Sequence, residues 1–219
     1  MFRRLRGLKV APQARIDQEM NLACTVLFIF SSLEKGQVGS MASAPYTEWV
    51  KEGFSANTRA VVLTVSDRCS KGEQADVSGP AVARLLKAAG IESISTRIVP
   101  DEVDAIITAL RHYARTAHLI ITTGGTGLAA RDVTPDATRL VCERLVEGLA
   151  ERMRADGMQH TPFAALSRAV CGVTGKTLVV NLPGSPAGAE TSLQSVLSLL
   201  PHALALLAGN TAHSVPNAR

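Results

Sequence analysis

The sequence predicts an α/β fold, a three-layer sandwich in which a mostly parallel sheet carries helices on both faces. Two observations lead to this class. Short runs rich in aliphatic and β-branched residues alternate along the chain with longer segments of helical periodicity. Most of the short runs lack the polar alternation of a half-exposed strand, which is typical of strands buried on both faces of a parallel sheet.

Four of the short runs are predicted to be strands. Each ends where polar or turn-forming residues begin, as expected when a strand reaches the edge of a sheet. They cover residues 59–66, 93–99, 118–122 and 176–181.

Helices are predicted between these strands. Residues 78–90 carry a helix-start signal in Ser78, which can cap, and in Pro80 in the first turn, and Gly90 can end this helix. The next helix begins near Asp101, where the helix dipole favours an acid, and its aliphatic residues recur at i, i+3, i+4 and i+7. Further helical segments are expected over 134–145, over 147–168 with breaks at Gly157 and Pro162, and from the turn at 182–186 to residue 207.

The predicted domain covers residues 58–208, after an extension (1–57) and before a tail (209–219). An apolar run at 21–33 is shorter than the roughly 20 residues of a membrane-spanning helix, so no membrane partner is expected. Acidic residues just before this run disfavour a signal peptide. The extension is therefore expected to be disordered, unless translation begins at Met41.

The charge distribution argues against nucleic acid as a partner. The formal net charge is +4, but residues 1–40 hold six basic against three acidic residues, whereas residues 41–219 hold seventeen against sixteen. Aromatic residues make up only 4% of the chain, so base stacking lacks its usual side chains. The four cysteines show no metal-binding spacing, which favours a reducing cytoplasm as the location.

Two glycine-containing turns follow predicted strands. One is TTGGTG, residues 122–127, and the other is NLPGSP, residues 181–186. In open α/β sheets, ligands bind at the carboxyl ends of the strands, where such turns gather. Glycine permits a backbone with positive φ and close approach of a ligand to N–H groups, so each turn is suited to cradle a phosphate.

Acidic residues are expected near both turns. Asp101 begins a helix, Asp132 follows the first turn directly after Arg131, and Asp67 and Asp76 border the loop after the first strand. Carboxylates beside phosphate sites indicate a divalent cation between them. Mg²⁺ is the natural choice, because one or two carboxylates together with substrate phosphates and water complete its octahedron.

Each of these features also has a structural interpretation. Glycine pairs by themselves more often only permit a tight turn. Asp101 and Asp132 are each placed to cap a helix, and the Ser167 hydroxyl can bond to backbone. The sequence GKT at 175–177 is not a phosphate-binding loop, because Val170 stands where that loop needs its first glycine.

Six segments between about residues 58 and 207 can be taken together. In order they read TVSDRCSKGEQADVSGP, VPDE, LIITTGGTG, ARDVTPDAT, TPFAALSRAVCGVTGKTLVVNLPGSP and LLPHALALL. These segments resemble the molybdopterin adenylyltransferase family of molybdenum cofactor biosynthesis, with the greatest likeness to the G domains of gephyrin and its plant counterpart. One departure is Ala130, where family members often have proline, and this change should loosen the loop slightly.

The resemblance implies a reaction in which the terminal phosphate of molybdopterin attacks the α-phosphate of Mg-ATP, giving adenylyl-molybdopterin and pyrophosphate. It implies that Asp101, Asp132 and Ser167 are the catalytic residues, the two acids being essential and binding Mg²⁺ and Ser167 contacting the pterin or its phosphate. The residues that it places in the substrate site are Ser66, Asp67, Asp76, Ser78, Thr123, Gly124, Gly125, Thr126, Gly127, Arg131, Asn181, Pro183, Gly184 and Ser185.

The resemblance also bears on partners. Family members are usually trimers, so a homotrimer is expected, and a molybdate-insertion protein is a candidate partner that receives the product. One alternative function is a non-catalytic domain that binds molybdopterin or serves as a scaffold. A second alternative, molybdate insertion itself, generally comes with further domains, for which this length leaves no room.

Overall fold

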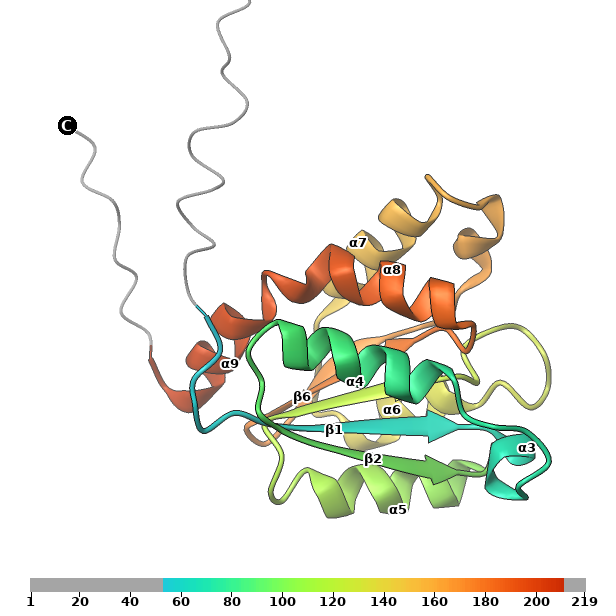
Figure 1. Ribbon diagram of the computed structural model, residues 1–219, viewed down its shortest axis with the longest axis horizontal. Coiled ribbons are helices and arrows are strands. Elements are labelled where there is room, and N and C mark those ends of the chain that lie inside the picture. The colour runs from blue at the N-terminus through green and yellow to red at the C-terminus, as the bar shows by residue number, and fades with distance from the viewer. Residues whose placement is uncertain (1–52, 211–219) are drawn as a thin grey trace, which may run out of the picture. The chain divides into compact units, whose positions relative to one another are not determined.

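Six strands form one sheet in the order β2-β1-β3-β6-β5-β4, as the computed structural model of residues 53–210 shows (Figure 1). The predictions for residues 1–52 and 211–219, including the start at Met41, lie outside the described residues. The strands are β1 (Arg59–Val65), β2 (Ser93–Val99), β3 (Leu119–Thr123), β4 (Arg144–Leu145), β5 (Cys171–Thr174) and β6 (Thr177–Leu182).

Four strands of this sheet run parallel. β1 pairs with both β2 and β3, and β3 pairs with β6, all in parallel register. β5 is antiparallel to β6, and β4 is antiparallel to β5. The prediction of a mostly parallel sheet is therefore confirmed, and the four predicted strands agree with β1, β2, β3 and β6 to within one residue at each end.

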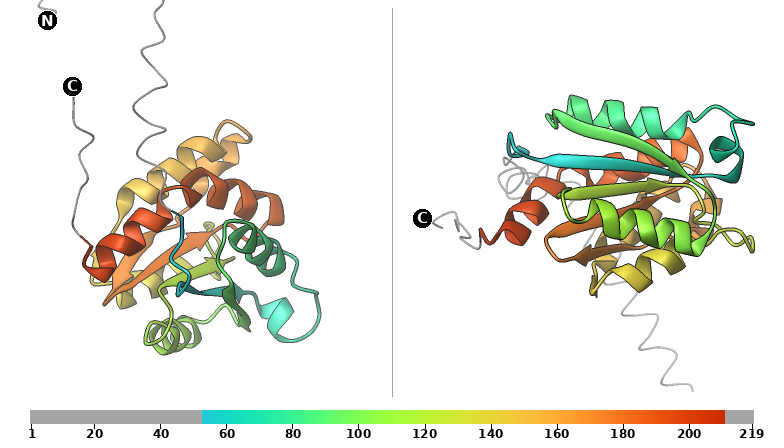
Figure 2. Two further views of the ribbon diagram at one scale, coloured as in Figure 1. Left: turned by 60° about the vertical axis from the view of Figure 1, so that its left-hand side comes forward. Right: turned by 90° about the horizontal axis from the view of Figure 1, so that it is seen from below.

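Helices cover both faces of the sheet (Figure 2). Alternate residues of β1 face opposite layers: Val62 belongs to the same core cluster as Leu86, whereas Leu63 belongs to the cluster that contains Ile106. The first cluster includes residues of α4 (Ser78–Ala88), α7 (Glu147–Gly157), α8 (Pro186–Leu197) and α9 (Leu200–Ala208), and the second includes residues of α5 (Val103–Tyr113) and α6 (Thr134–Val141). The three-layer sandwich is confirmed.

The helix predicted over 134–145 is wrong at its C-terminal end. It stops at Val141, because the chain turns away to form β4 against β5. At Gly172 of β5, a Cβ would lie 2.7 Å from the sulfur of Cys142, so only glycine lets the two segments come this close. Neither β4 nor β5 is predicted from the sequence, whereas the breaks at Gly157 and Pro162 are confirmed by the end of α7 and the start of the 3₁₀ helix η1 (Pro162–Leu166).

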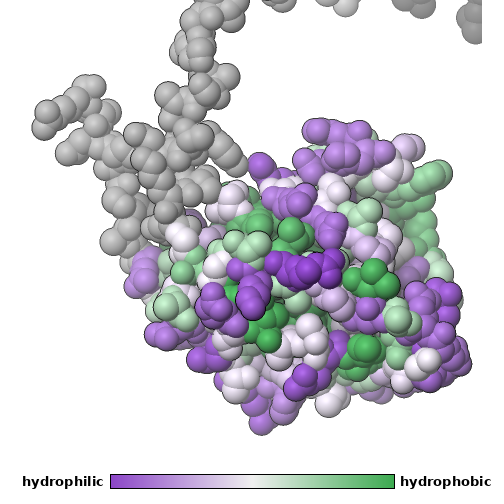
Figure 3. Space-filling model, viewed as in Figure 1, coloured by the Kyte–Doolittle hydropathy of each residue, from purple (hydrophilic) through white to green (hydrophobic). Residues whose placement is uncertain are grey.

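Within residues 53–210, no single helix is long and hydrophobic enough to cross a bilayer. Only α8 and α9 taken together have the required length and composition, and this pair is bent by 60°. On the face drawn in Figure 3, hydrophobic side chains form separate groups between polar ones.

Candidate functional site

The carboxyl ends of the parallel strands lie at one edge of the sheet, next to the short helix α3 (Asp67–Ser70) and the first turns of α4 and α8 (Figure 1). Two cavities open there. The first, about 670 Å³, is called the acidic cavity because Asp67, Asp76, Asp101 and Asp132 line it. The second, about 560 Å³, is called the apolar cavity because Phe163, Ala164 and Leu166 of η1 contribute to its wall. The residues that line both cavities are Gly125, Asp132, Gly184 and Ser185.

The first glycine turn separates these cavities and needs glycine for two physical reasons. Gly124 and Gly125 have φ values of +99° and +61°, which side chains rarely adopt. A Cβ on Gly124 would also lie 2.3 Å from the carbonyl oxygen of Val65, and one on Gly125 would lie 2.4 Å from Oγ1 of Thr134. The turn therefore has no room for larger residues.

Thr134, the first residue of α6, donates hydrogen bonds to two carbonyl groups of this turn. Its hydroxyl donates to Gly124 O at 2.9 Å, and its N–H donates to Gly125 O at 3.1 Å. Among the hydrogen bonds of residues 53–210, none uses the N–H of Gly125, Thr126 or Gly127 as donor. The carbonyl groups of Gly124 and Gly125 are thus bound, whereas three N–H groups of the turn are free for an anion.

The second glycine turn packs directly on the first. A Cβ on Gly184 would lie 3.2 Å from Cα of Gly124, and the Gly124 N–H donates to Leu182 O at 3.1 Å. Ser185 caps α8, since its hydroxyl accepts from the Gly188 N–H at 3.3 Å. Because that bond uses the oxygen as acceptor, the hydroxyl proton remains available for a ligand.

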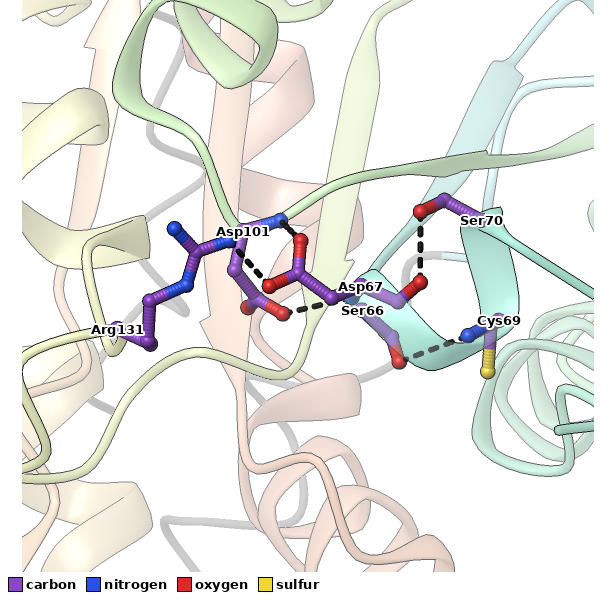
Figure 4. Close-up of polar contacts among 6 residues, drawn as sticks. All are labelled: Ser66, Asp67, Cys69, Ser70, Asp101 and Arg131. Atoms are coloured by element: carbon purple, nitrogen blue, oxygen red, sulfur yellow. Dashed lines mark hydrogen bonds and ion pairs between the residues drawn. The ribbon is translucent and has the colours of Figure 1, made fainter. Parts of the chain in front are cut away.

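Asp67 and Asp101 are joined by two reciprocal hydrogen bonds (Figure 4). The Asp67 N–H donates to Oδ2 of Asp101 at 2.8 Å, and the Asp101 N–H donates to Oδ1 of Asp67 at 3.0 Å. Arg131 forms an ion pair with Oδ2 of Asp67. The hydrogen bond from Arg131 holds the pKa of Asp67 below its usual value, whereas burial raises the pKa of Asp101.

Neither predicted catalytic acid serves as a helix cap. The residue before α5 is Glu102, which makes no side-chain cap bond, and Asp101 bonds to Asp67 instead. Oδ2 of Asp132 accepts from the Ala129 N–H at 2.8 Å, across the loop that it belongs to, and not from the first turn of α6. This bond fixes the loop and leaves Oδ1 of Asp132 without a protein donor among the described residues.

Asp76, and not Ser78, bonds to the first turn of α4, although Val77 is the residue directly before the helix. Its Oδ1 accepts from the Gly79 N–H at 2.9 Å, and its Oδ2 accepts from the Thr64 hydroxyl at 2.7 Å. The Ser78 hydroxyl lies 3.0 Å from that of Thr123. The prediction that Ser78 caps α4 is therefore wrong, and Asp76 has both oxygens bound to protein.

The other predicted site residues divide into three groups. Ser167 and Pro183 line the apolar cavity with Thr126 and Gly127, and Ser66 lines the acidic cavity, where it also caps α3. Arg131, whose side chain is 59% exposed, and Asn181 line neither cavity.

Asn181 is buried in the core. Its amide nitrogen donates to the hydroxyls of Thr122 and Thr138 at 2.9 and 3.0 Å, and its amide oxygen accepts from the Val170 N–H at 3.4 Å. It thereby joins β6, β3, α6 and the segment before β5, and the structure does not bring it to the ligand edge.

Thr134 and Phe163 are the functional candidates that the sequence reasoning missed. The bonds of Thr134 to the glycine turn follow from the loop 124–133 folding back, which no local pattern reports. Phe163 is 75% exposed beside the apolar cavity. Its only sequence signal is the segment TPFAAL, in which an aromatic follows a threonine cap and a proline.

The comparisons with known proteins agree with this arrangement. The family described as "Probable molybdopterin binding domain" matches residues 61–202. A curated relative, the molybdopterin adenylyltransferase of Helicobacter pylori strain J99, is 39% identical over 153 residues, which are 68% of this chain and 87% of its own. The Drosophila melanogaster protein "Molybdenum cofactor synthesis protein cinnamon" is 42% identical over 149 residues, 67% of this chain but only 25% of its own.

A solved structure shows the same fold. The molybdopterin biosynthesis enzyme MoaB of Thermus thermophilus is 51% identical, with a TM-score of 0.65, and the match covers 69% of this chain and 97% of that one. The chain thus spans most of its bacterial relatives and about a quarter of the fly protein. The described residues and the comparisons agree that this chain belongs to the family of probable molybdopterin binding domains.

Proposed function

We propose that the chain is a molybdopterin adenylyltransferase, which transfers AMP from ATP to the terminal phosphate of molybdopterin and releases pyrophosphate. It is an enzyme of molybdenum cofactor biosynthesis. The observation that carries this proposal is the packing of two glycine turns against each other, with free N–H groups on the first and two carboxylates, Asp101 and Asp132, on the wall of the same cavity.

In the reaction, an oxygen of the molybdopterin phosphate forms a bond to the α-phosphorus of ATP, and the bond from that phosphorus to the bridging oxygen breaks. Pyrophosphate leaves with that electron pair. Such a transfer needs little covalent chemistry from the protein and depends on positioning and neutralising charge. The free N–H groups of Gly125 and Gly127, together with the Ser185 hydroxyl, are placed to hold phosphate oxygens.

The donor set fits Mg²⁺ that arrives with the nucleotide. Among residues 53–210 there is no cluster of three or more His, Cys, Asp or Glu side chains that could hold a metal alone. Asp101 and Asp132 each keep one carboxylate oxygen free of hydrogen bonds within this part of the chain, and two carboxylates with phosphates and water satisfy magnesium. Asp101 and Asp132 would hold Mg²⁺, which would neutralise charge on the phosphates.

The two cavities suit the two substrates. The acidic cavity, with its carboxylates and the first glycine turn, receives the triphosphate and the metal. The apolar cavity, with the exposed ring of Phe163 and the hydroxyl of Ser167, receives the pterin. The reacting phosphates then meet beside Gly125, Asp132 and Gly184, which line both cavities.

Three finer expectations belong to the same proposal. A homotrimer and a molybdate-insertion protein that receives the product rest on the family resemblance, and a cytoplasmic location rests on the cysteine spacing. The alternative function, a domain that binds molybdopterin without catalysing a reaction, is one outcome of the test below.

The test is pyrophosphate release by the full chain with molybdopterin, ATP and Mg²⁺. We expect release that requires all three, loss of release in Asp101→Ala and Asp132→Ala, and retained molybdopterin binding in both variants. Asp104→Asn, which changes an exposed acid in the first turn of α5, is the matched control. Binding of molybdopterin without pyrophosphate release by the unmodified chain would replace the enzyme with a binding protein.

A further inference from the structure

The parallel pairing of β1 and β2 brings Asp67 and Asp101 together. The ladder continues one residue past β1, since the Ser66 N–H donates to Val99 O at 2.9 Å. Asp67, two residues past the end of β1, and Asp101, two residues past the end of β2, then bond to each other. As a result, an acid that follows β1 and an acid that follows β2 lie side by side at the edge of the acidic cavity (Figure 4).

The oxygens of these two carboxylates differ in their hydrogen-bond partners. Both oxygens of Asp67 are bound, Oδ1 by the Asp101 N–H and Oδ2 by Arg131. Asp101 uses only Oδ2, for the Asp67 N–H. Its Oδ1 faces the glycine turn, since a Cβ on Gly125 would lie 3.2 Å from it. Asp101 therefore presents to the site one oxygen that has no protein donor among the described residues, whereas each oxygen of Asp67 already accepts a protein hydrogen bond.

Arg131 is the cation that could take this free oxygen. Its side chain is 59% exposed, on the loop that also carries Asp132. The hydrogen bond to Asp67 raises the pKa of the Arg131 guanidinium, and the nearby charge of Asp101 also raises it. An arginine that bonds to a carboxylate occupies its oxygens and cancels its charge, which are the two properties that a metal or phosphate site needs from Asp101.

We propose that Asp67 is a positioning residue: its carboxylate holds Arg131 and thereby keeps the guanidinium off Oδ1 of Asp101. This inference rests on the proposed function, since it concerns the same site. Asp67 then acts through Arg131 and Asp101 and need not touch the substrate. The expected consequence of its loss is a slower reaction at saturating substrate, because Arg131 then neutralises Asp101.

The test compares three variants, Asp67→Asn, Arg131→Gln and the double variant, by pyrophosphate release at saturating molybdopterin and Mg²⁺. Asparagine keeps an oxygen for the Asp101 N–H but no longer attracts Arg131. We expect D67N to lower kcat by roughly tenfold, the scale of one charge-assisted hydrogen bond redirected onto a reacting group, with a smaller effect on KM for ATP. The double variant should be faster than D67N, because no guanidinium remains to cover Asp101.

A double variant no faster than D67N would overturn the proposal, as would a D67N enzyme with unchanged kcat. If the ion pair between Asp67 and Arg131 has only a structural role, the double variant should be as slow as either single variant. Measurements of Tm show whether each variant is folded. A second pair, Asp67→Glu and Asp67→Gln, keeps the result decisive if D67N folds poorly. These side chains match in length and differ in charge, so we expect D67E to retain more of kcat than D67Q.

A crystal structure of D67N gives a readout that does not depend on activity. We expect the Arg131 guanidinium within about 4 Å of the Asp101 carboxylate, the ordinary ion-pair distance. A guanidinium that turns into solvent would reject the positioning role even if the protein proved to bind molybdopterin without reaction. An inactive unmodified chain would reject the proposed reaction alone, so the two failures are distinguishable.

Discussion

Gly124 lies directly against the last carbonyl group of β1, since a Cβ on Gly124 would be only 2.3 Å from Val65 O. This contact explains how the first glycine turn reaches the neighbouring strand β1, whose carboxyl end it covers. It also offers a matched comparison, because Gly90 has the same φ of +99° and no atom within 4 Å of its own Cβ position.

We therefore expect Gly124→Ala to destabilise the fold far more than Gly90→Ala. Alanine at a positive φ costs about 1–2 kcal/mol of free energy of unfolding by itself, which is the whole effect at Gly90. At Gly124 the clash with Val65 O adds to this, for a total of about 3 kcal/mol or more. Urea denaturation of both variants measures the difference in their free energies of unfolding. Equal decreases would mean that β1 moves away from the added methyl group without a loss of stability.

The fold could be predicted largely from local patterns, because β1, β3 and β6 are buried apolar runs separated by segments of helical periodicity. The strands that sequence reasoning missed, β4 and β5, cover two and four residues. β4 forms because residues 144–145 find β5 as a partner, which overrides the helical pattern predicted to continue through them. Pairing with a distant segment leaves no local signal.

The site could be predicted in its residue types but not in its bonds. The glycines and Asp101 are recognisable because turns and acids after parallel strands share one edge. That Asp76 is bound by Thr64, and Asp67 by Arg131, depends on contacts between residues 12 apart in the first case and 64 apart in the second. Asn181 lies within β6 with its side chain buried in the core, so the ligand contact that the resemblance implies for it stays a prediction.

The buried amide of Asn181 leads to a prediction on stability. In Asn181→Ala, the Val170 N–H and the hydroxyls of Thr122 and Thr138 lose their shared partner. Each buried polar group left unpaired costs about 1–3 kcal/mol, so we expect a loss of about 3 kcal/mol in the free energy of unfolding. Asn57→Ala, at an exposed asparagine, is the control. Weaker ligand binding by N181A with an unchanged free energy of unfolding would instead support a direct contact.

His118 should make stability depend on pH. Its Nδ1 accepts from the Arg59 N–H at 3.0 Å, which requires a neutral ring, and burial together with the Arg59 charge lowers its pKa below 6.5. The unfolded chain then binds the proton more readily. The stabilisation is complete above about pH 6.5 and is lost as the pH falls through the lowered pKa of the folded state.

The variant His118→Asn isolates this effect, because its amide oxygen can accept the same N–H without titrating. We expect the free energy of unfolding of H118N to fall less steeply than that of the unmodified chain as the pH is lowered from about 7 to about 5, measured by urea denaturation. Parallel curves for the two proteins would show that His118 does not contribute.

The cysteines of residues 53–210 should differ sharply in reactivity. Burial raises the pKa of Cys142 to about 11 and that of Cys171 to about 12, so at pH 8 their thiolate fractions are on the order of 10⁻³ and 10⁻⁴. Cys69 is half-buried and lines the acidic cavity. In a Cys24→Ser background we expect one fast reaction with iodoacetamide in the native protein and three after denaturation, with mass spectrometry locating the fast site at Cys69.

Mg-ATP should slow the reaction of Cys69 with iodoacetamide, because the nucleotide proposed for the acidic cavity covers the thiol. Native labelling of Cys142 or Cys171 at the rate of Cys69 would contradict the burial that raises their pKa, and labelling of Cys69 that ignores Mg-ATP would place the nucleotide elsewhere.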